Sequence, residues 1–312
     1  MIATGITGEA SRLMAKARDI QGRSLWVDAR HRLMRNRAAV VSIVVLAVIA
    51  LMAVFAPLLS QYAYDYQDYA VMSCSPNWWS EASGVCNAGG THWFGTDSLG
   101  RDLFVRVLYG ARVSMSVGIV ATLVSLLIGV AYGATAGYVG GRIDALMMRF
   151  VDVLYSLPFI FFVIILMVVF NRNFILLFVA IGAVEWLTMA RIVRGQTLSI
   201  KQKEFIEAAR AGGVGTWGII RRHVIPNVLG PVIVYVTLTI PAVILAESFL
   251  SFLGLGITDP LTSWGVLIAE GTNNMENYPW MLIFPSAFMG VTLFCFNFIG
   301  DGLRDALDPK DR

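Results

Sequence analysis

Long runs of apolar residues constrain this chain more than any other feature of its sequence. A helix needs about 20 apolar residues to cross the ~30 Å hydrocarbon layer of a membrane. Six runs approach or exceed this length: 38–59, 113–135, 151–170, 174–190, 229–254 and 280–300. Only 14% of the 312 residues are charged, whereas an average soluble domain has about 25%. We therefore expect an all-α integral membrane protein with six transmembrane helices.

Positively charged residues predict the orientation of these helices, because membrane proteins carry an excess of Lys and Arg on the cytoplasmic side. Seven Lys and Arg residues lie in the connection 191–222, and none lies in 257–279. Four arginines precede the first run: Arg30, Arg32, Arg35 and Arg37. The pattern predicts six spans with both termini in the cytoplasm. The expected segments are a cytoplasmic tail 1–37, a first transmembrane helix 38–59, an extracytoplasmic segment 60–112, a five-helix core 113–300 and a cytoplasmic tail 301–312.

Three arginines fit this topology poorly. Arg101, Arg106 and Arg112 belong to the segment 60–112, which the pattern places outside the cytoplasm. The topology rule does not explain them.

The N-terminal region resembles a cytoplasmic tail followed by a retained anchor. The first apolar run begins near residue 38 and is long enough to span, unlike the short apolar core of a signal peptide. We expect an amphipathic helix at residues 11–19 of the tail. The formal net charge of +3 is too small to indicate a nucleic-acid partner.

Two cysteines, Cys74 and Cys86, lie in the expected extracytoplasmic segment. That compartment permits a disulfide between them, which would contribute roughly 3 kcal/mol in the chain-entropy model. The alternative is two free thiols. Their spacing does not match a metal-site pattern, and we expect no metal ion.

The stretch 204–227 is charged and glycine-rich, unlike the apolar runs around it. Ser199 and Gln202 form a capping-box pattern, which predicts that a helix begins there. Gly212, Gly213 and Gly215 permit positive φ and a sharp turn. Thr216 is a candidate cap for a second short helix, which we expect Pro226 to end before the fifth span.

Glu207 has two readings in this stretch. Its carboxylate can make a charge-assisted contact with an Arg or Lys of another protein. Alternatively, it pairs with Lys203 or Arg210 in its own helix, for about 0.2–0.5 kcal/mol. The residue pattern alone leaves both open.

The stretch resembles the EAA motif of permease subunits in ATP-binding-cassette importers, E-A-A-x-x-x-G followed by nine residues and I-x-L-P. Four residues match the first part in order and spacing: Glu207, Ala208, Ala209 and Gly213. Pro226 stands at the position of the family's proline. The sequence departs from the motif at His223, where the family has Ile, and at Ile225, where it has Leu.

Three further segments resemble the C subunit of oligopeptide permeases. They are HWFGTDSLGRDLFVRVLYGARVSMSVG at 92–118, LAESFLSFLGLG at 245–256 and GDGLRDALDPKDR at 300–312. The resemblance covers nearly all of the chain after about residue 30.

The resemblance implies a type I importer permease fold in the cell inner membrane and a transport role. In that family the EAA region, here within 195–227, docks on a cytoplasmic ATPase: Glu207 would anchor the dock, Ala208 and Ala209 would allow close approach, and Gly213 would make the turn. The implied partners are a B-type permease subunit, two ATP-binding subunits and an extracytoplasmic peptide-binding protein that docks on 62–112 and 257–279.

The chain has no phosphate-binding loop of the type G-x-x-x-x-G-K-[ST]. We therefore expect no enzymatic activity, no catalytic residue and no cofactor in this chain, with ATP and Mg²⁺ bound by the partner ATPases.

Ionisable residues inside spans are candidates for function. We expect Asp152 and Glu185 near the cytoplasmic ends of their spans. There they would lie either at the membrane–water interface or in the transport path. Glu247, beside Ser248 and Ser251, either faces the translocation path or forms hydrogen bonds between helices. We expect kinks at Pro158, Pro241 and Pro285. Gly129, Gly133 and Gly137 predict a close helix contact, within the chain or with a partner permease.

Two other classes of protein compete with the importer interpretation. A stand-alone secondary transporter often has two related halves, and no clear internal repeat is present. An intramembrane enzyme would need a catalytic motif, and none of the expected ones occurs. Within the importer family, oligopeptides are the expected substrate, and dipeptides, nickel or another small solute are the alternatives.

Overall fold

The computed structural model describes residues 25–79, 86, 90–169 and 174–307. Apart from one isolated bridge between Thr96 and Asp102, the regular secondary structure of these residues is helical. The helices are α2 (Leu25–Arg35), α3 (Arg37–Val54), α4 (Ala56–Leu59), the 3₁₀ turn η1 (Tyr69–Val71), α6 (Leu103–Val139), α7 (Gly141–Tyr155), α8 (Phe159–Val169), α9 (Phe174–Lys201), α10 (Glu204–Ala211), α11 (Thr216–Ile219), the π-helical turn η2 (Ile220–Val224), α12 (Ile225–Phe252), α13 (Trp264–Asn273) and α14 (Trp280–Leu307). The all-α prediction is confirmed.

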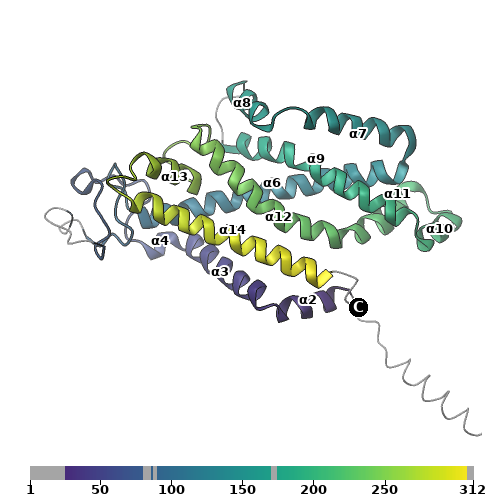
Figure 1. Ribbon diagram of the computed structural model, residues 1–312, viewed down its shortest axis with the longest axis horizontal. Helices are drawn as coiled ribbons and strands as arrows, with labels where there is room; N and C mark the ends of the chain where they lie inside the picture. Colours follow the sequence, from purple (N-terminus) through teal and green to yellow (C-terminus); the bar gives the residue numbers. More distant parts are fainter. Residues whose placement is uncertain (1–24, 80–85, 87–89, 170–173, 308–312) are drawn as a thin grey trace, which may run out of the picture.

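The long helices run side by side along the molecule (Figure 1). α6 contacts α9 and α12, and α14 contacts α12 and α3. The short helices α10 and α11 lie at one end of this bundle, which we call the α10 end. The short helix α13 and the segment that precedes α6 lie at the opposite end, the α13 end (Figure 1).

In the described part of the chain, four helices are long and apolar enough to cross a membrane. They are α3, α6, the continuous helix Thr216–Phe252 and α14. The two other predicted runs, 151–170 and 174–190, have a different form. The first is divided, since α7 ends at Tyr155 and α8 begins at Phe159. Pro158 lies in this break, where it removes a backbone donor and disfavours helix at the preceding residue.

The second of these runs belongs to α9, which has 28 residues and continues past residue 190 to Lys201. α6 likewise begins ten residues earlier than predicted, at Leu103 rather than residue 113, and has 37 residues. Charged residues at the ends of both helices concealed them from a search for apolar runs.

The glycines of α6 allow a close contact with α9, as predicted from their spacing. A Cβ atom added at Gly137 would lie 2.8 Å from Cβ of Thr197 and 2.9 Å from the carbonyl oxygen of Arg194. Gly129 and Gly133 meet Met189 and Ala190 in the same way. The contact therefore lies between two helices of the same chain.

The arginines that fitted the topology poorly are bonded to other groups of the chain. Arg101 and Arg106 are buried, and both pair with Asp97 and Glu270. Arg101 also bonds to Asp259 at 2.8 Å. Burial alone would lower the pKa of Arg101, but Asp97 and the other carboxylates raise it above its ordinary value. Because these charges are neutralised within the fold, they do not act as free charges that orient a helix.

Arg112 has a different partner. Its guanidinium donates to the backbone carbonyls of Ala53 and Val54, where α3 ends, with an Nη2–O distance of 2.7 Å to Val54. The last carbonyls of a helix lack intrahelical donors and carry partial negative charge, so a cation is stabilised there.

In the segment before α6, Cys74 and Cys86 form a disulfide with a Cα–Cα distance of 5.6 Å. The backbone N–H of Cys74 also donates to Thr96 Oγ1 at 2.8 Å. The helix expected at 11–19 lies outside the described residues, as do most of the tail 1–37 and the last part of 301–312.

Candidate functional site

The helix that carries the EAA-like residues is α10, at the α10 end of the bundle. It has eight residues, Glu204–Ala211, and its N-cap residue is Lys203, whose side chain makes no capping bond. The capping box predicted at Ser199 and Gln202 is therefore wrong. α9 continues to Lys201, and the Ser199 hydroxyl donates to the carbonyl of Gly195 inside that helix, at 3.5 Å. This back-bonding satisfies the hydroxyl without a cap.

The turn after α10 uses one of the three candidate glycines. Gly213 has φ +80°, whereas Gly212 and Gly215 have φ −72° and −67°. The N–H groups of Gly213 and Val214 bond to the carbonyls of Arg210 and Ala209 at 3.0 and 3.1 Å. These bonds satisfy carbonyls that would otherwise lack donors at the end of α10.

The second helix does not end at Pro226, contrary to the prediction. α11, η2 and α12 follow one another without a break from Thr216 to Phe252. In η2 the N–H of Ile225 bonds to the carbonyl of Ile220, five residues earlier. Pro226 follows directly after this π-helical turn, inside the continuous helix, so its missing N–H removes one intrahelical bond without ending the helix. Gly215, rather than Thr216, is the N-cap residue of α11.

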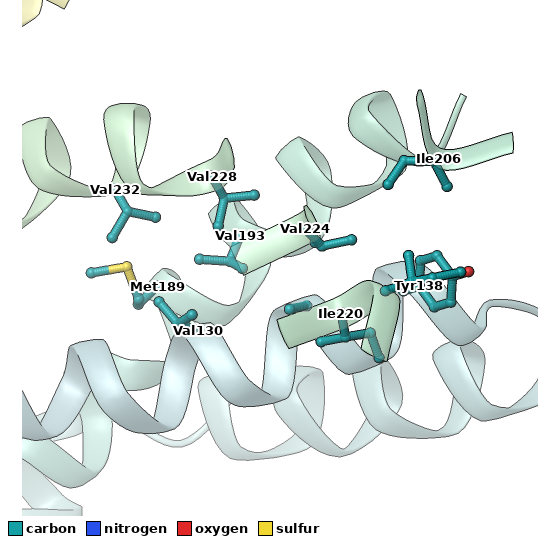
Figure 2. Packing of buried hydrophobic residues seen from close by; sticks show 11 residues of the cluster. Val130, Tyr138, Met189, Val193, Ile206, Ile220, Val224, Val228 and Val232 are labelled. Carbon is teal, nitrogen blue, oxygen red and sulfur yellow. The ribbon is translucent and has the colours of Figure 1, made fainter. Parts of the chain in front are cut away.

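One side chain, Ile206, fixes α10 to the bundle. It is fully buried, in a cluster that includes Tyr138 of α6 and Ile220, Val224 and Val228 of the η2–α12 helix (Figure 2). Figure 2 shows Ile206 approaching this cluster from the short helix above it. Burying such a side chain contributes about 1.5–3 kcal/mol.

The other side of α10 is open. Glu207 and Ala208 are exposed, and Ala209 is partly buried. Two large side chains are also exposed nearby, Phe205 at 42% and Trp217 at 71%. We call the surface formed by Phe205, Glu207, Ala208 and Trp217 the α10 face. It combines two exposed aromatic rings with a small residue and a carboxylate, and aromatic rings are enriched at surfaces that bind another protein.

The geometry bears on the two readings of Glu207. An ion pair requires a nitrogen–oxygen distance of at most 4.0 Å. Among the described residues, neither Lys203 nor Arg210 forms such a pair with the Glu207 carboxylate. Arg210 instead lies over the ring of Tyr138, with Cζ 6.0 Å from the ring centre. The Glu207 carboxylate is therefore exposed, and the pairing with its own helix is not formed among the described residues. Gly213 and Pro226 are also exposed at this end.

The second group of candidates, Glu247, Ser248 and Ser251, lies in α12 near the α13 end. Glu247 is fully buried, and its carboxyl group accepts hydrogen bonds from Ser251 at 2.7 Å, Ser263 at 2.6 Å and Ser114 at 3.3 Å. Ser248 donates to the sulfur of Met289 at 3.2 Å. Glu247 thereby joins α12 to α6 and α13, which favours the reading that it forms hydrogen bonds between helices.

Sequence reasoning missed Ser114 and Ser263, because both are far from Glu247 along the chain. A local signal was available for Ser263, since a serine before Trp264 is a typical N-cap. Its hydroxyl accepts from the N–H of Val266 at 3.2 Å and so caps α13.

Asp152 and Glu185 lie near the break between α7 and α8, contrary to the expectation that they lie at the span ends near the stretch 204–227. Asp152 pairs with Arg191 at 2.8 Å, and both side chains are exposed. Glu185 lines a cavity beside Pro158. Sequence reasoning did not identify the ion pair between Asp144 of α7 and Arg194 of α9, in which both carboxylate oxygens accept from the guanidinium. No group of three His, Cys, Asp or Glu side chains in the described ranges could hold a metal ion.

Comparison with known proteins gives two family models that match the chain. The model for "Binding-protein-dependent transport system inner membrane component" matches residues 129–312. The model for "N-terminal TM domain of oligopeptide transport permease C" matches residues 24–76.

Curated relatives match almost the whole chain. The oligopeptide transport system permease protein OppC of Escherichia coli (strain K12) is 59% identical over 294 residues, which are 94% of each chain. The OppC protein of Bacillus subtilis (strain 168) is 42% identical over 310 residues, 99% of this chain and 96% of the relative. The dipeptide transport system permease protein DppC of the same organism is 46% identical over 286 residues, 91% of this chain and 86% of the relative.

Proposed function

The chain belongs to the family of binding-protein-dependent transport system inner membrane components, and we propose that it forms half of the translocation pathway of an ATP-binding-cassette importer for oligopeptides. It is a multi-pass inner-membrane permease and a transport component rather than an enzyme. The observation that carries the substrate class is the 59% identity with an oligopeptide permease across 94% of both chains.

The topology that we propose has six spans: α3, α6, the divided pair α7–α8, α9, α12 and α14. Both termini lie in the cytoplasm, with tails at 1–37 and 301–312. The α10 end is then cytoplasmic, and the α13 end with the segment 60–112 is extracytoplasmic. The excess of Lys and Arg in 191–222 supports this orientation. The internal pairing of Arg101 and Arg106 removes the main argument against it.

The α10 face is the proposed contact with an ATP-binding subunit. Ile206 holds α10 on the bundle, and the exposed Phe205, Ala208 and Trp217 are available for a groove on the partner. Glu207 would meet an Arg or Lys of that groove. Binding of ATP and Mg²⁺ takes place on two partner subunits, and closure of that pair moves the two permeases between inward-open and outward-open states.

The remaining proposed partners are a B-type permease and an extracytoplasmic peptide-binding protein. Large apolar side chains cover the outer surface of α7 and α8, for example Leu146 at 73% and Phe161 at 64% exposure, and suit contact with the second permease or with lipid. The binding protein would dock at the α13 end, on residues 62–112 and 257–279.

Dipeptides are the second candidate substrate. Relatives with the same framework include dipeptide permeases and, at 36% identity, the glutathione transport system permease protein GsiD of Pectobacterium atrosepticum. A framework shared by different substrates is expected if the binding protein does most of the selection.

Uptake by the complete complex tests the proposed function. The permease is reconstituted in vesicles with its B-type partner, both ATPases and the binding protein, and ATP-dependent uptake of a labelled pentapeptide, a dipeptide and Ni²⁺ is compared. We expect uptake of the pentapeptide that requires ATP and the binding protein. Uptake of only the dipeptide or Ni²⁺ would reassign the substrate, and uptake without the ATPases would point to a stand-alone transporter.

A further inference from the structure

A cavity of about 410 Å³ lies where α7 and α8 are interrupted. Its described walls come from residues on both sides of the break, from Leu154 to Pro158 and at Phe162, and from α9 between Ala183 and Thr188. The walls are mainly apolar: they include Leu154, Leu157, Phe162 and Leu187. The volume is in the range of sites for small molecules, large enough for one end of a peptide but not for a long chain.

Among the described residues that line this cavity, Glu185 is the acidic one, and Thr188 follows it one helical turn along α9. Tyr155 lines the opposite wall, and Tyr235 of α12 is close enough to interact with both Glu185 and Thr188. None of the described residues donates a hydrogen bond or forms an ion pair with the Glu185 carboxylate. The Glu185 carboxylate is thus a hydrogen-bond acceptor in the cavity for which the described residues supply no donor.

The nearest cations on α9 already have partners. Arg191 pairs with Asp152 and lies over the ring of Tyr155 at 4.3 Å, and Arg194 pairs with Asp144. These contacts hold both guanidinium groups against α7. They leave Glu185 uncompensated, although an ionisable group at membrane depth normally has a partner or faces a water-filled path.

The end of α7 adds to the same electrostatic preference. α7 ends at Tyr155, which lines the cavity, and the last carbonyls of a helix carry partial negative charge. A carboxylate and a helix C-terminus at one cavity both stabilise a cation and disfavour an anion. Unwound backbone between two half-helices is a common place for cation binding in transporters.

We propose that Glu185 binds the α-ammonium group of the peptide during its passage, with Thr188 and Tyr155 as neighbouring polar contacts in the cavity at the α7–α8 break. This proposal rests on the proposed function, since it takes the cargo to be a peptide and the cavity to border its path. Every unmodified peptide has an α-ammonium group, so the site would recognise cargo without regard to side-chain sequence. Apolar walls would accept the first side chain of the peptide.

Two measurements on the full complex in vesicles test the site. The first is ATP-dependent uptake of a labelled pentapeptide by the wild type, Glu185→Gln and Glu185→Asp. Asp301→Asn, which removes an exposed carboxylate at the far end of α14, is the matched control. We expect Glu185→Gln to lower uptake at least tenfold, Glu185→Asp to retain part of it and the control to match the wild type. Copurification of the partners and ATPase stimulation by loaded binding protein should be unchanged in all variants.

The second measurement is carbodiimide coupling during transport, which joins a carboxylate to an amine in contact with it. We expect mass spectrometry to find the pentapeptide joined through its α-amine to Glu185, and no such product with Glu185→Gln or with an amino-terminally acetylated peptide. A product between Glu185 and a lysine of the partner permease would overturn the proposal, because the cation would then come from the assembly. Equal uptake by the wild type and Glu185→Gln would also overturn it. Absence of ATP-dependent peptide uptake in the wild type would instead reject the proposed function.

Discussion

Glu247 of α12 accepts a hydrogen bond from Ser263, the residue that caps α13, at an oxygen–oxygen distance of 2.6 Å. One serine hydroxyl therefore caps the N-terminus of α13 and also attaches that helix to a buried carboxyl group. Trp264, the next residue, is fully buried and donates from its indole to the carbonyl of Val107 at 3.1 Å. α13 is consequently held to both α12 and α6.

Ser263→Ala should loosen α13. The change removes an N-cap, worth about 1 kcal/mol, and a hydrogen bond of about 1 kcal/mol. We expect a loss of about 2 kcal/mol in thermal unfolding of the purified protein and faster hydrogen exchange in 264–273. Ser248→Ala is the control, because that hydroxyl donates to the sulfur of Met289 at 3.2 Å and caps no helix, so its loss should cost less. Equal losses in both variants would contradict a special role for Ser263.

Arg106→Met should be far more destabilising than Arg191→Met. Arg106 is buried, and its loss leaves Arg101 as the only cation paired with Asp97 and Glu270 among the described residues. Removing one partner of a buried ion pair typically costs about 3–5 kcal/mol, so we expect a loss near the lower end of this range. Arg191 pairs with Asp152 where both side chains are exposed in the isolated chain, and an exposed pair contributes about 0–1 kcal/mol in the purified protein. Chemical denaturation of both variants compares the two, and similar midpoints would show that the buried network has little net effect.

Ile206→Ala should detach α10 from the bundle while the spans stay folded. Truncating a fully buried isoleucine costs about 2–5 kcal/mol. We expect increased proteolysis and hydrogen exchange within 204–211, together with weaker retention of the ATPase subunits. Phe205→Ala is the matched variant, since its side chain is 42% exposed: it should leave exchange unchanged and affect only ATPase retention. Protection of 204–211 in Ile206→Ala would argue against Ile206 as the anchor.

Glu207→Ala should reduce ATP-dependent peptide uptake at least tenfold without changing the stability of the permease, because its carboxylate is exposed and has no ion pair among the described residues. Glu204→Ala removes an equally exposed carboxylate from the same helix and should keep most of the uptake. If the two variants behave alike, the net charge of α10 matters rather than Glu207 itself.

Gly213→Ala and Gly195→Ala should shift stability in opposite directions. Neither glycine has a neighbour within 4 Å of an added Cβ, so only the backbone differs. Gly213 has φ +80°, where alanine is disfavoured by roughly 1–2 kcal/mol. Gly195 lies within α9, where alanine is favoured by about 0.5–1 kcal/mol. Thermal unfolding and uptake are measured for both, and a Gly213→Ala protein that matches the wild type would show that the turn can change its conformation.

The sequence predicted the helical class because long apolar runs have few other solutions in a membrane. It was less successful at the ends of helices, where the relevant partners are far away in the chain. From the sequence alone, Arg106 is a charge that contradicts the predicted topology, because its partners Asp97 and Glu270 are not evident. α9 reads as short because Arg191 and Arg194 interrupt the apolar pattern, although both are paired with α7.

The candidate site divides in the same way. The turn at Gly213 follows from local backbone preference and was predicted. Ile206 as the anchor was not, because the residues that bury it, such as Tyr138 and Val224, belong to other helices. The continuation of the helix through Pro226 depends on the π-helical turn η2, for which no reliable sequence signal exists.

Because no break separates α11 from α12, one continuous helix joins the α10 end of the molecule to the α13 end. Thr216–Phe252 has 37 residues, and at 1.5 Å per residue it measures about 55 Å. Tilting a rod of that length by ~5° about its base displaces its tip by roughly 5 Å. The base carries Trp217 beside α10, and the tip carries Glu247, which is attached to α13 through Ser263. A rotation of the whole helix about its base would therefore move the region of Glu247 and α13 by several ångströms, as a mechanical linkage that needs no chemical messenger.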